Sequence, residues 1–139
     1  LIVLQYAQLL LAEIKKFAKA HGLRLVTIGA SQKWISDMLV LNPFEVLFVF
    51  SKAKFIITDT FHGTIFASKY NGKFATLLRK SNNNKLSDLA KRLSIEDHVI
   101  SDFSELENAY EKASSKERVN EIIENERLRT INYLKENLV

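Results

Sequence analysis

Residues 54–66 read KFIITDTFHGTIF and pass from an apolar run through a polar turn to a second apolar pattern. The run at residues 55–57 predicts a buried parallel strand, and the pattern at residues 64–67 predicts the start of a helix. The polar residues between them therefore belong to a strand-to-helix turn. In an open α/β sheet such a turn lies at the carboxyl end of a strand, where ligands bind, and the N–H groups of the following helix attract anions. We expect a ligand site here, with His62 beside a bound anion.

Apolar periodicity outside this turn predicts alternating strands and helices. Strands are expected at residues 1–4, 23–28, 54–58, 74–78 and 98–100, and helices at residues 7–18, from 43 onward, at 64–70, at 86–93 and in two segments after residue 102. Loops are expected at residues 29–40, which include Trp34 and Asp37, and at residues 80–84. The alternation predicts an α/β fold, a Rossmann-like parallel sheet with helices on both faces.

Three short patterns predict where helices begin. In the segment from Asn42 to Glu45, the asparagine can cap a helix, Pro43 suits the first helical position and the glutamate can return a hydrogen bond. The segments from Asp102 to Glu105 and from Ser114 to Glu117 have the same spacing and predict two further capping boxes.

The length of 139 residues fits one domain. The chain opens on the apolar run at residues 1–4 without an initiator methionine, so we expect it to be part of a longer protein. The expected organisation is a single Rossmann-like domain at residues 1–139, in which residues 115–139 form a terminal helix. That helix has apolar residues at helical intervals, and it is longer than a helix that covers one small sheet needs to be. We therefore expect part of its apolar face to have no packing partner within this chain.

Composition excludes several classes of protein. The absence of cysteine rules out disulfides and thiolate metal sites. The histidines, His21, His62 and His98, are far apart and none stands four residues from another, so no metal site is expected. No apolar segment is long enough to cross a bilayer. The net charge of +4 is spread over several predicted helices, which does not favour nucleic acid as a partner.

Residues 53–79, together with residues 82–89 that follow them in the sequence, resemble the C-terminal part of the polysaccharide pyruvyl transferase family. The mark of that family is an aspartate, a hydroxyl residue and then Phe-His-Gly-Thr after a buried strand, and residues 59–64 read DTFHGT. Thr60 stands where serine is commoner in the family and keeps the hydroxyl. Downstream, Arg79, an asparagine run, Lys85 and the pair Asp88-Leu89 are similar to the family's pattern.

The resemblance implies an enzyme with two Rossmann-like domains of GT-B type, of which this chain is the C-terminal half. Such enzymes take phosphoenolpyruvate, the donor substrate, and place its pyruvyl group as a ketal on a sugar of a bacterial surface polysaccharide, releasing phosphate. No metal and no cofactor beyond the donor is implied. The saccharide acceptor, which could be lipid-linked, would be contacted mainly by the missing N-terminal domain. The resemblance implies the cytoplasm, with a peripheral position at the inner face of the membrane as one option, and we expect this chain alone to be inactive.

Roles for the site residues follow from this resemblance and from side-chain chemistry. We expect His62 to be the catalytic proton donor, because imidazole can hold and release a proton near neutral pH, or else a group that positions the donor. Arg79 is expected to bind the carboxylate or phosphate of the donor, if its strand neighbours the strand before the histidine turn. Lys85 is a second candidate cation. The alternative for each of these is an ordinary surface or turn residue.

The other residues of the turn are expected to shape the donor site. Asp59 is interpreted as a scaffold for the turn, since an aspartate at a strand end often orients backbone N–H groups. Thr60 and Thr64 can donate to a phosphate, cap the helix, or do both. Gly63 is expected to allow close backbone approach or a positive φ.

Two other functions remain open from the sequence. One is a nucleotide-sugar-dependent glycosyltransferase of GT-B type, whose second domain has the same architecture and binds a diphosphate at the same turn. The other is a non-catalytic α/β interaction domain, for which the histidine turn would be dispensable.

Overall fold

The computed structural model describes residues 2–5, 11–28 and 37–138 of the chain. Over these residues the strands form one six-stranded sheet in the order β3-β2-β1-β4-β5-β6, and every neighbouring pair is parallel. The strands are β1 (Ile2–Gln5), β2 (Leu25–Ile28), β3 (Met38–Leu39), β4 (Phe55–Thr58), β5 (Phe74–Leu77) and β6 (Val99–Ile100). This is the strand order of dinucleotide-binding Rossmann folds, in which the order reverses between β1 and β4. The predicted α/β fold with a parallel sheet is confirmed.

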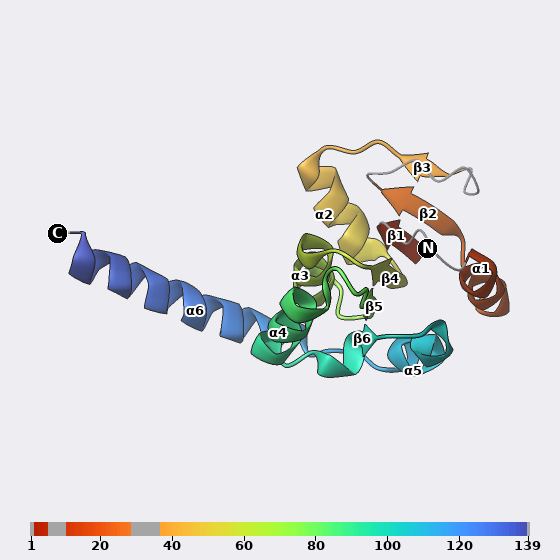
Figure 1. The fold of residues 1–139 in the computed structure, drawn as a ribbon. Helices are drawn as coiled ribbons and strands as arrows, with labels where there is room; N and C mark the ends of the chain where they lie inside the picture. Colours follow the sequence, from red (N-terminus) through yellow and green to blue (C-terminus); the bar gives the residue numbers. More distant parts are fainter. Residues whose placement is uncertain (1, 6–10, 29–36, 139) are drawn as a thin grey trace.

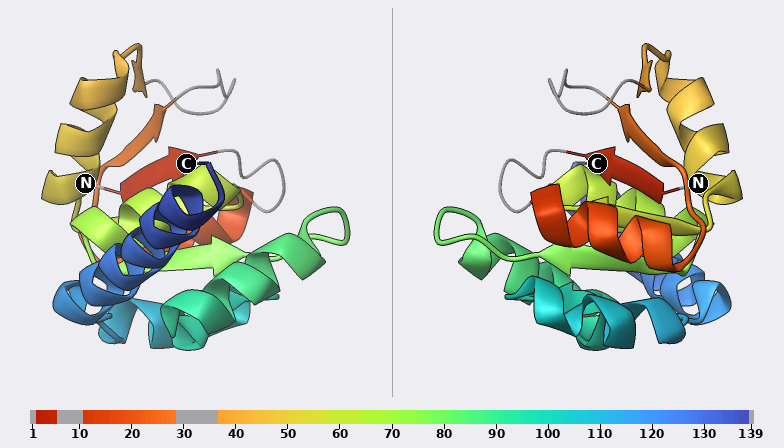
Figure 2. Two further views of the ribbon diagram at one scale, coloured as in Figure 1. Left: turned by 90° about the vertical axis from the view of Figure 1, so that its left-hand side faces the viewer. Right: turned by 90° about the vertical axis from the view of Figure 1, so that its right-hand side faces the viewer.

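Helices lie on both faces of the sheet (Figures 1 and 2). They are α1 (Leu11–Ala20), α2 (Pro43–Lys52), α3 (Phe61–Tyr70), α4 (Asn83–Leu93), α5 (Leu106–Glu111) and α6 (Lys116–Asn137), with 3-10 turns η1 (Glu96–His98) and η2 (Phe103–Glu105). The core cluster on one face joins α1 and α5 to the sheet, and the cluster on the other face joins α2, α3, α4 and the first turn of α6 to it. The right-hand view of Figure 2 shows α1 lying across the first of these faces, with α5 below it.

Strand β4 shows why the sheet needs cover on both sides. Phe55 and Ile57 belong to the core cluster with α1 and α5, whereas Ile56 belongs to the cluster with α2, α3 and α4. All three side chains are fully buried. Successive side chains of a strand point to opposite faces, so a continuous apolar run fits only a strand that is covered twice. Strand β5 follows the same alternation, with Phe74 on one face and Ala75 on the other.

The helix starts confirm two of the three predicted capping boxes. Asn42 accepts hydrogen bonds from the N–H of Phe44 and of Glu45, and the Glu45 carboxylate accepts from the N–H of Asn42. Asp102 and Glu105 form the same reciprocal pair at η2, which leads into α5. The prediction was wrong for the last helix.

Residue Ser115 caps α6, one position later than predicted. Its hydroxyl accepts a hydrogen bond from the N–H of Arg118 at 3.1 Å. The N–H of Ser114, which the predicted capping box would pair with Glu117, donates instead to the carbonyl of Gly72 at 2.8 Å. Gly72 has a φ of +85°, as expected for the predicted turn after α3.

The segment of β3 and the start of α4 differ from the sequence prediction. Met38 and Leu39, expected in a loop, pair with the end of β2 as the short edge strand β3, while residues 29–36, including Trp34, lie outside the described residues. Helix α1 is described from Leu11, and its end at Ala20, with Gly22 at a φ of +60°, fits the predicted stop. Helix α4 begins at Asn83, inside the segment that was predicted as a loop.

The C-terminal helix α6 starts against the domain and then leaves it, as Figure 1 shows. Val119 at the end of its first turn is buried against the cluster with α3 and α4, and Ile122 and Ile123 are half-buried there. Leu128 and Leu134 further along are 51% and 44% exposed. In the described part of the chain, no helix is both long enough and apolar enough to cross a bilayer.

Candidate functional site

The polar turn after β4 lies at the carboxyl edge of the sheet, beside the point where the strand order reverses. Strand β4 ends at Thr58 and α3 begins at Phe61. Thr60 caps α3, because its hydroxyl accepts a hydrogen bond from the N–H of Gly63 at 3.0 Å. The N–H of Thr60 in turn donates to the hydroxyl of Thr58 at 3.2 Å. A strand-to-helix turn follows β4 as predicted, and it stands where Rossmann-type sheets bind their ligands. The helix begins at Phe61, before the predicted start at residue 64, so His62 and Gly63 lie in its first turn and not in the turn before it.

Thr64 supports this turn from inside the protein. Its side chain is fully buried, and its hydroxyl donates to the carbonyl of Thr60 at 2.9 Å and lies 3.0 Å from the hydroxyl of Thr76 on β5. Gly63 is also buried and has ordinary helical backbone, so the expected positive φ is absent at this residue. Both residues act on the shape of the turn, and neither presents a side chain to solvent.

Asp59 is a buried acid at the first position of the turn. Its side chain is 1% exposed, and among the described residues neither carboxylate oxygen accepts a hydrogen bond. The Nε of Arg79 lies 3.1 Å from Oδ2, which is an ion-pair distance without hydrogen-bond geometry. Burial raises the pKa of Asp59 to about 6, and the charge of Arg79 lowers it against that trend. A carboxyl group with such a pKa can exchange a proton near neutral pH.

Arg79 and Asp59 come together because β4 and β5 are neighbours. The two strands pair in register, with Thr58 opposite Thr76, so the residues that follow each strand meet at the same edge. The conditional prediction that Arg79 would lie near the histidine turn is thereby confirmed. The Arg79 side chain is 40% exposed, which leaves part of the guanidinium open to solvent.

The side chain of Asn82 links the segment after β4 to the segment after β5 by hydrogen bonds to the main chain of each. Its Oδ1 accepts a hydrogen bond from the N–H of Arg79 at 2.7 Å, and its Nδ2 donates to the carbonyl of Asp59 at 2.7 Å. The sequence did not predict this clamp. Asn82 occupies the N-cap position of α4, where an asparagine normally caps its own helix, but it makes no capping hydrogen bond there.

The ring of His62 stands at the open side of the turn, in the first turn of α3. The residue is exposed, and its ring centroid lies 6.0 Å from that of Phe61 and 6.5 Å from that of Phe66. Within the described residues, neither ring nitrogen has a hydrogen-bond partner. The alternative that His62 merely bonds its own turn therefore finds no support, and both nitrogens can reach a ligand.

Two backbone donors accompany this histidine. The first N–H groups of a helix have no partner inside it. Thr60 satisfies those of Gly63 and Thr64. Across the described residues no acceptor is found for the N–H groups of Phe61 and His62, so they remain for water or an anion.

Lys85 makes none of the contacts that join this group. It lies exposed in the first turn of α4, and the contacts among the described residues do not join it to Asp59, Arg79 or His62. The same part of the chain contains no cluster of three or more metal-ligating side chains.

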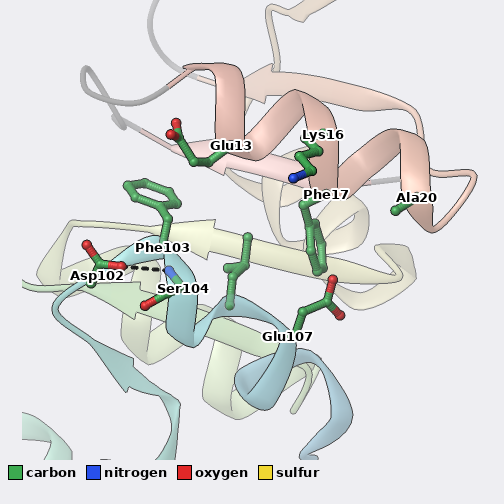
Figure 3. Close-up of a pocket in the computed structure, with 9 residues that line it drawn as sticks. Glu13, Lys16, Phe17, Ala20, Asp102, Phe103, Ser104 and Glu107 are labelled. Atoms are coloured by element: carbon green, nitrogen blue, oxygen red, sulfur yellow. Dashed lines mark hydrogen bonds between the residues drawn. The ribbon is translucent and has the colours of Figure 1, made fainter.

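Two cavities in the described part of the chain lie away from these residues. One of about 440 Å³ opens between α1 and the η2–α5 segment, where Phe17 and Phe103 face each other across it (Figure 3). A second of about 320 Å³ is lined by His98, Lys112 and Arg118. None of Asp59, His62 and Arg79 lines either cavity.

Comparisons of the chain with protein-family models, with curated proteins and with solved structures found no match. The functional argument therefore rests on the residues of the turn and their arrangement.

Proposed function

We propose that this domain binds phosphoenolpyruvate and serves in the transfer of its pyruvyl group to a saccharide, forming a ketal and releasing phosphate. The observation that carries the proposal is the arrangement at the sheet edge, where exposed His62 stands in the first turn of α3 and Arg79 is held against Asp59 at 3.1 Å. The resemblance of residues 59–64 to the pyruvyl transferase motif supports it.

The donor carries a phosphate and a carboxylate, and both need positive partners. Arg79 offers a guanidinium whose exposed part can bind either group bidentately. The N–H groups of Phe61 and His62 offer a second anchor at the positive end of the dipole of α3. Thr60 and Thr64 hold the turn in place behind these donors, and Lys85 serves at most as a more distant cation.

The reaction requires a proton at the vinyl CH₂ carbon of the donor. Protonation turns this carbon into a methyl group and makes the central carbon electrophilic, so that two sugar hydroxyls can add there while phosphate leaves. Of the two hydroxyl protons released, one replaces the proton given to the methyl group and the other leaves with phosphate. We assign His62 as the acid, since its ring nitrogens are accessible and imidazole can deliver a proton near neutral pH.

The exposure of His62 and Arg79 fits a domain that forms one wall of a cleft. In the proposed enzyme a second Rossmann-like domain supplies the other wall and most contacts to the saccharide, which would be a precursor of a bacterial surface polysaccharide. The reaction would take place in the cytoplasm or at the inner face of the membrane. This chain alone would bind the donor without turning it over.

A second candidate, a nucleotide-sugar glycosyltransferase, is favoured by one observation. The strand order β3-β2-β1-β4-β5-β6 is that of domains that bind nucleotides at the same edge. A nucleoside diphosphate could then use Arg79 and the start of α3 for its phosphates. A non-catalytic interaction domain is the third possibility.

Thermal unfolding in the presence of each ligand separates these functions. A ligand that binds only the folded state stabilises it by about 2.7 kcal/mol at a concentration one hundred times its Kd. We expect phosphoenolpyruvate to raise the Tm of the wild type and to have little effect on Arg79→Ala. The matched control is Arg24→Ala, which removes an arginine from the exposed pair with Asp37 and should respond like the wild type.

The outcomes point to different functions. A rise in Tm with nucleoside diphosphates but not with phosphoenolpyruvate contradicts pyruvyl transfer and supports the glycosyltransferase. No rise with either ligand favours the interaction domain.

A further inference from the structure

The ion pair between Asp59 and Arg79 is buried on one side and open on the other. The carboxylate is 1% exposed and the arginine side chain 40%. The Nε of Arg79 faces Asp59 Oδ2, and a guanidinium has four further N–H donors on its terminal nitrogens. Among the described residues no acidic side chain other than that of Asp59 lies within ion-pair distance of Arg79. The outer edge of the guanidinium is therefore available to a second anion.

The position of Arg79 is fixed before any ligand arrives. Asn82 accepts a hydrogen bond from the N–H of Arg79 and donates one to the carbonyl of Asp59, each at 2.7 Å. The carboxylate of Asp59 in turn pairs with the Nε of Arg79. The main chain and the inner edge of the guanidinium are thus both restrained. Such preorganisation lowers the entropy lost when an anion binds.

The ionised form of Asp59 depends on Arg79 for its stability. Its two oxygens accept no hydrogen bond of good geometry within the described residues, so the charge of Arg79, followed by the N–H of Asp59 itself, favours the ionised carboxylate. The other charged or titratable side chains on the surrounding described elements are His62, Lys69 and Tyr70 on α3, Lys80 after β5, and Lys85, Asp88, Lys91 and Arg92 on α4. Of these, none lies at ion-pair distance from Asp59.

We propose that a small dianion bound to the outer edge of Arg79 draws a proton onto Asp59, so that the site takes up the anion and a proton together. An anion on Arg79 offsets the positive potential that keeps the buried carboxylate ionised, and the carboxylate then accepts a proton from solvent. This inference rests on the proposed function in one respect, namely that Arg79 is the anion contact. The new element is that Asp59 is a neutral carboxylic acid when the anion is bound. The site then has a second group that can carry a proton, in addition to His62.

The direction of the pH dependence follows from the sign of the coupling. In the free protein the pKa of Asp59 is raised to about 6. The bound anion raises it further. Affinity is therefore constant above the higher pKa of the complex, increases as the pH falls between the two values, and levels off below about 6. For a rise of one unit in the pKa of Asp59, linkage gives about fivefold tighter binding at pH 6 than at pH 8, with about half a proton taken up at pH 6.5.

Sulfate is a suitable probe because it keeps its double negative charge over this pH range. Calorimetric titration at pH 6.5 in two buffers with different enthalpies of ionisation measures the number of protons taken up. We expect about half a proton for the wild type and for His62→Gln, and none for Asp59→Asn. Asp37→Asn is the matched control, since Asp37 forms a comparable pair with Arg24 at 3.2 Å on the surface, and it should behave as the wild type.

A second measurement needs no variant and so does not depend on how Asp59→Asn folds. The ¹³C shift of the Asp59 carboxyl, followed by NMR against pH, gives its pKa with and without sulfate. We expect sulfate to raise this pKa by about one unit. An unchanged pKa, or proton uptake that disappears in His62→Gln and persists in Asp59→Asn, overturns the inference.

The two proposals can fail separately. Sulfate binding without proton uptake overturns the coupling and leaves Arg79 as a donor contact. Sulfate binding with proton uptake, in an enzyme that leaves phosphoenolpyruvate unchanged, supports the coupling and overturns pyruvyl transfer. No binding of sulfate at all overturns the coupling and the assignment of Arg79 together.

Discussion

The hydroxyls of Thr64 and Thr76 lie 3.0 Å apart in the buried layer between α3 and β5. Thr64 has one hydroxyl proton, which it donates to the carbonyl of Thr60, so Thr76 is the donor in the bond between the two threonines. The helix that carries His62 is thereby joined to the strand that precedes Arg79. The two halves of the candidate site are held in place by a pair of buried hydroxyls.

This direction of donation predicts unequal effects of removing the two hydroxyls. Thr64→Val leaves the Thr76 hydroxyl buried without an acceptor and should lower the free energy of unfolding by about 1–3 kcal/mol. Thr76→Val removes a donor and leaves Thr64 still bonded to Thr60, so its cost should be about 1 kcal/mol or less. Urea unfolding of both variants measures the difference. A larger loss for Thr76→Val would contradict the assigned direction.

For His62, the proposed role as proton donor predicts a loss of catalysis without a loss of fold. In the complete enzyme, His62→Gln should slow phosphate release from phosphoenolpyruvate by about 100- to 10,000-fold, because a positioned acid contributes that much. Because the side chain is exposed and has no hydrogen-bond partner within the described residues, the Tm should stay close to that of the wild type. Activity within a few-fold of the wild type would remove His62 from the mechanism.

For Arg79, the proposed contact predicts weaker donor binding. Arg79→Ala should weaken the binding of phosphoenolpyruvate by about 1.5–3 kcal/mol, the usual contribution of a charge-assisted hydrogen bond. Calorimetry provides the Kd, and circular dichroism checks that the variant is folded. Arg24→Ala serves as the control for loss of one positive charge. Equal Kd values for the wild type and Arg79→Ala would make Arg79 a bystander.

The raised pKa of Asp59 predicts a pH dependence of stability. Its pKa in the folded state is about 6, against an ordinary value of 3.8. Since the folded state binds this proton more tightly, the contribution to stability is full below pH 3.8 and is lost as the pH rises through 6. The loss is on the order of 3 kcal/mol.

Asp59→Asn keeps the shape of the side chain and removes this titration. The difference in the free energy of unfolding between wild type and variant should therefore shift in favour of the variant as the pH rises from 4 to 7. The comparison also cancels the contribution of buried His98, whose pKa is lowered by burial and whose effect on stability has the opposite sign. A difference that stays constant with pH would show that Asp59 titrates normally.

The two described glycines with positive φ provide a matched test of backbone fit. A Cβ on Gly72 would lie 2.9 Å from the carbonyl oxygen of Ser114, whereas a Cβ on Gly22 would have nothing within 4 Å. Gly72→Ala should therefore cost roughly 2–4 kcal/mol, from backbone strain and a clash with the connection into α6. Gly22→Ala meets strain alone and should cost about 1 kcal/mol. Thermal unfolding compares the two, and equal costs would contradict the close approach at Gly72.

The local chemistry of the sequence predicted the elements well where one signal dominated. The apolar run at residues 55–57 indicated burial on both faces, and the segment from Asn42 to Glu45 placed the start of α2 at the right residue. The start of α6 was missed because Ser114 and Ser115 are both good caps. The hydrogen bond from Ser114 to Gly72, which decides between them, joins residues 42 positions apart.

The candidate site was predictable in its residues but not in its connections. Asp59, His62 and Arg79 could be placed at one sheet edge from the strand pattern alone. The burial of Asp59, the full burial of Thr64 and the clamp formed by Asn82 depend on the packing of α3 and of the β5–α4 loop against β4. Strand β3 has two residues and too little periodicity to be recognised in the sequence, although the equally short β6 was predicted.

The hydrogen bonds that build the site span short stretches of chain. The longest of them, from Asn82 to Asp59, joins residues 23 positions apart, and the bond from Thr76 to Thr64 joins residues 12 apart. A structure closed by short loops forms with little loss of chain entropy and has low contact order. The unit of β4, α3, β5 and the following loop can therefore assemble as one folding step, and fraying at β3 or along the outer half of α6 would leave its geometry unchanged.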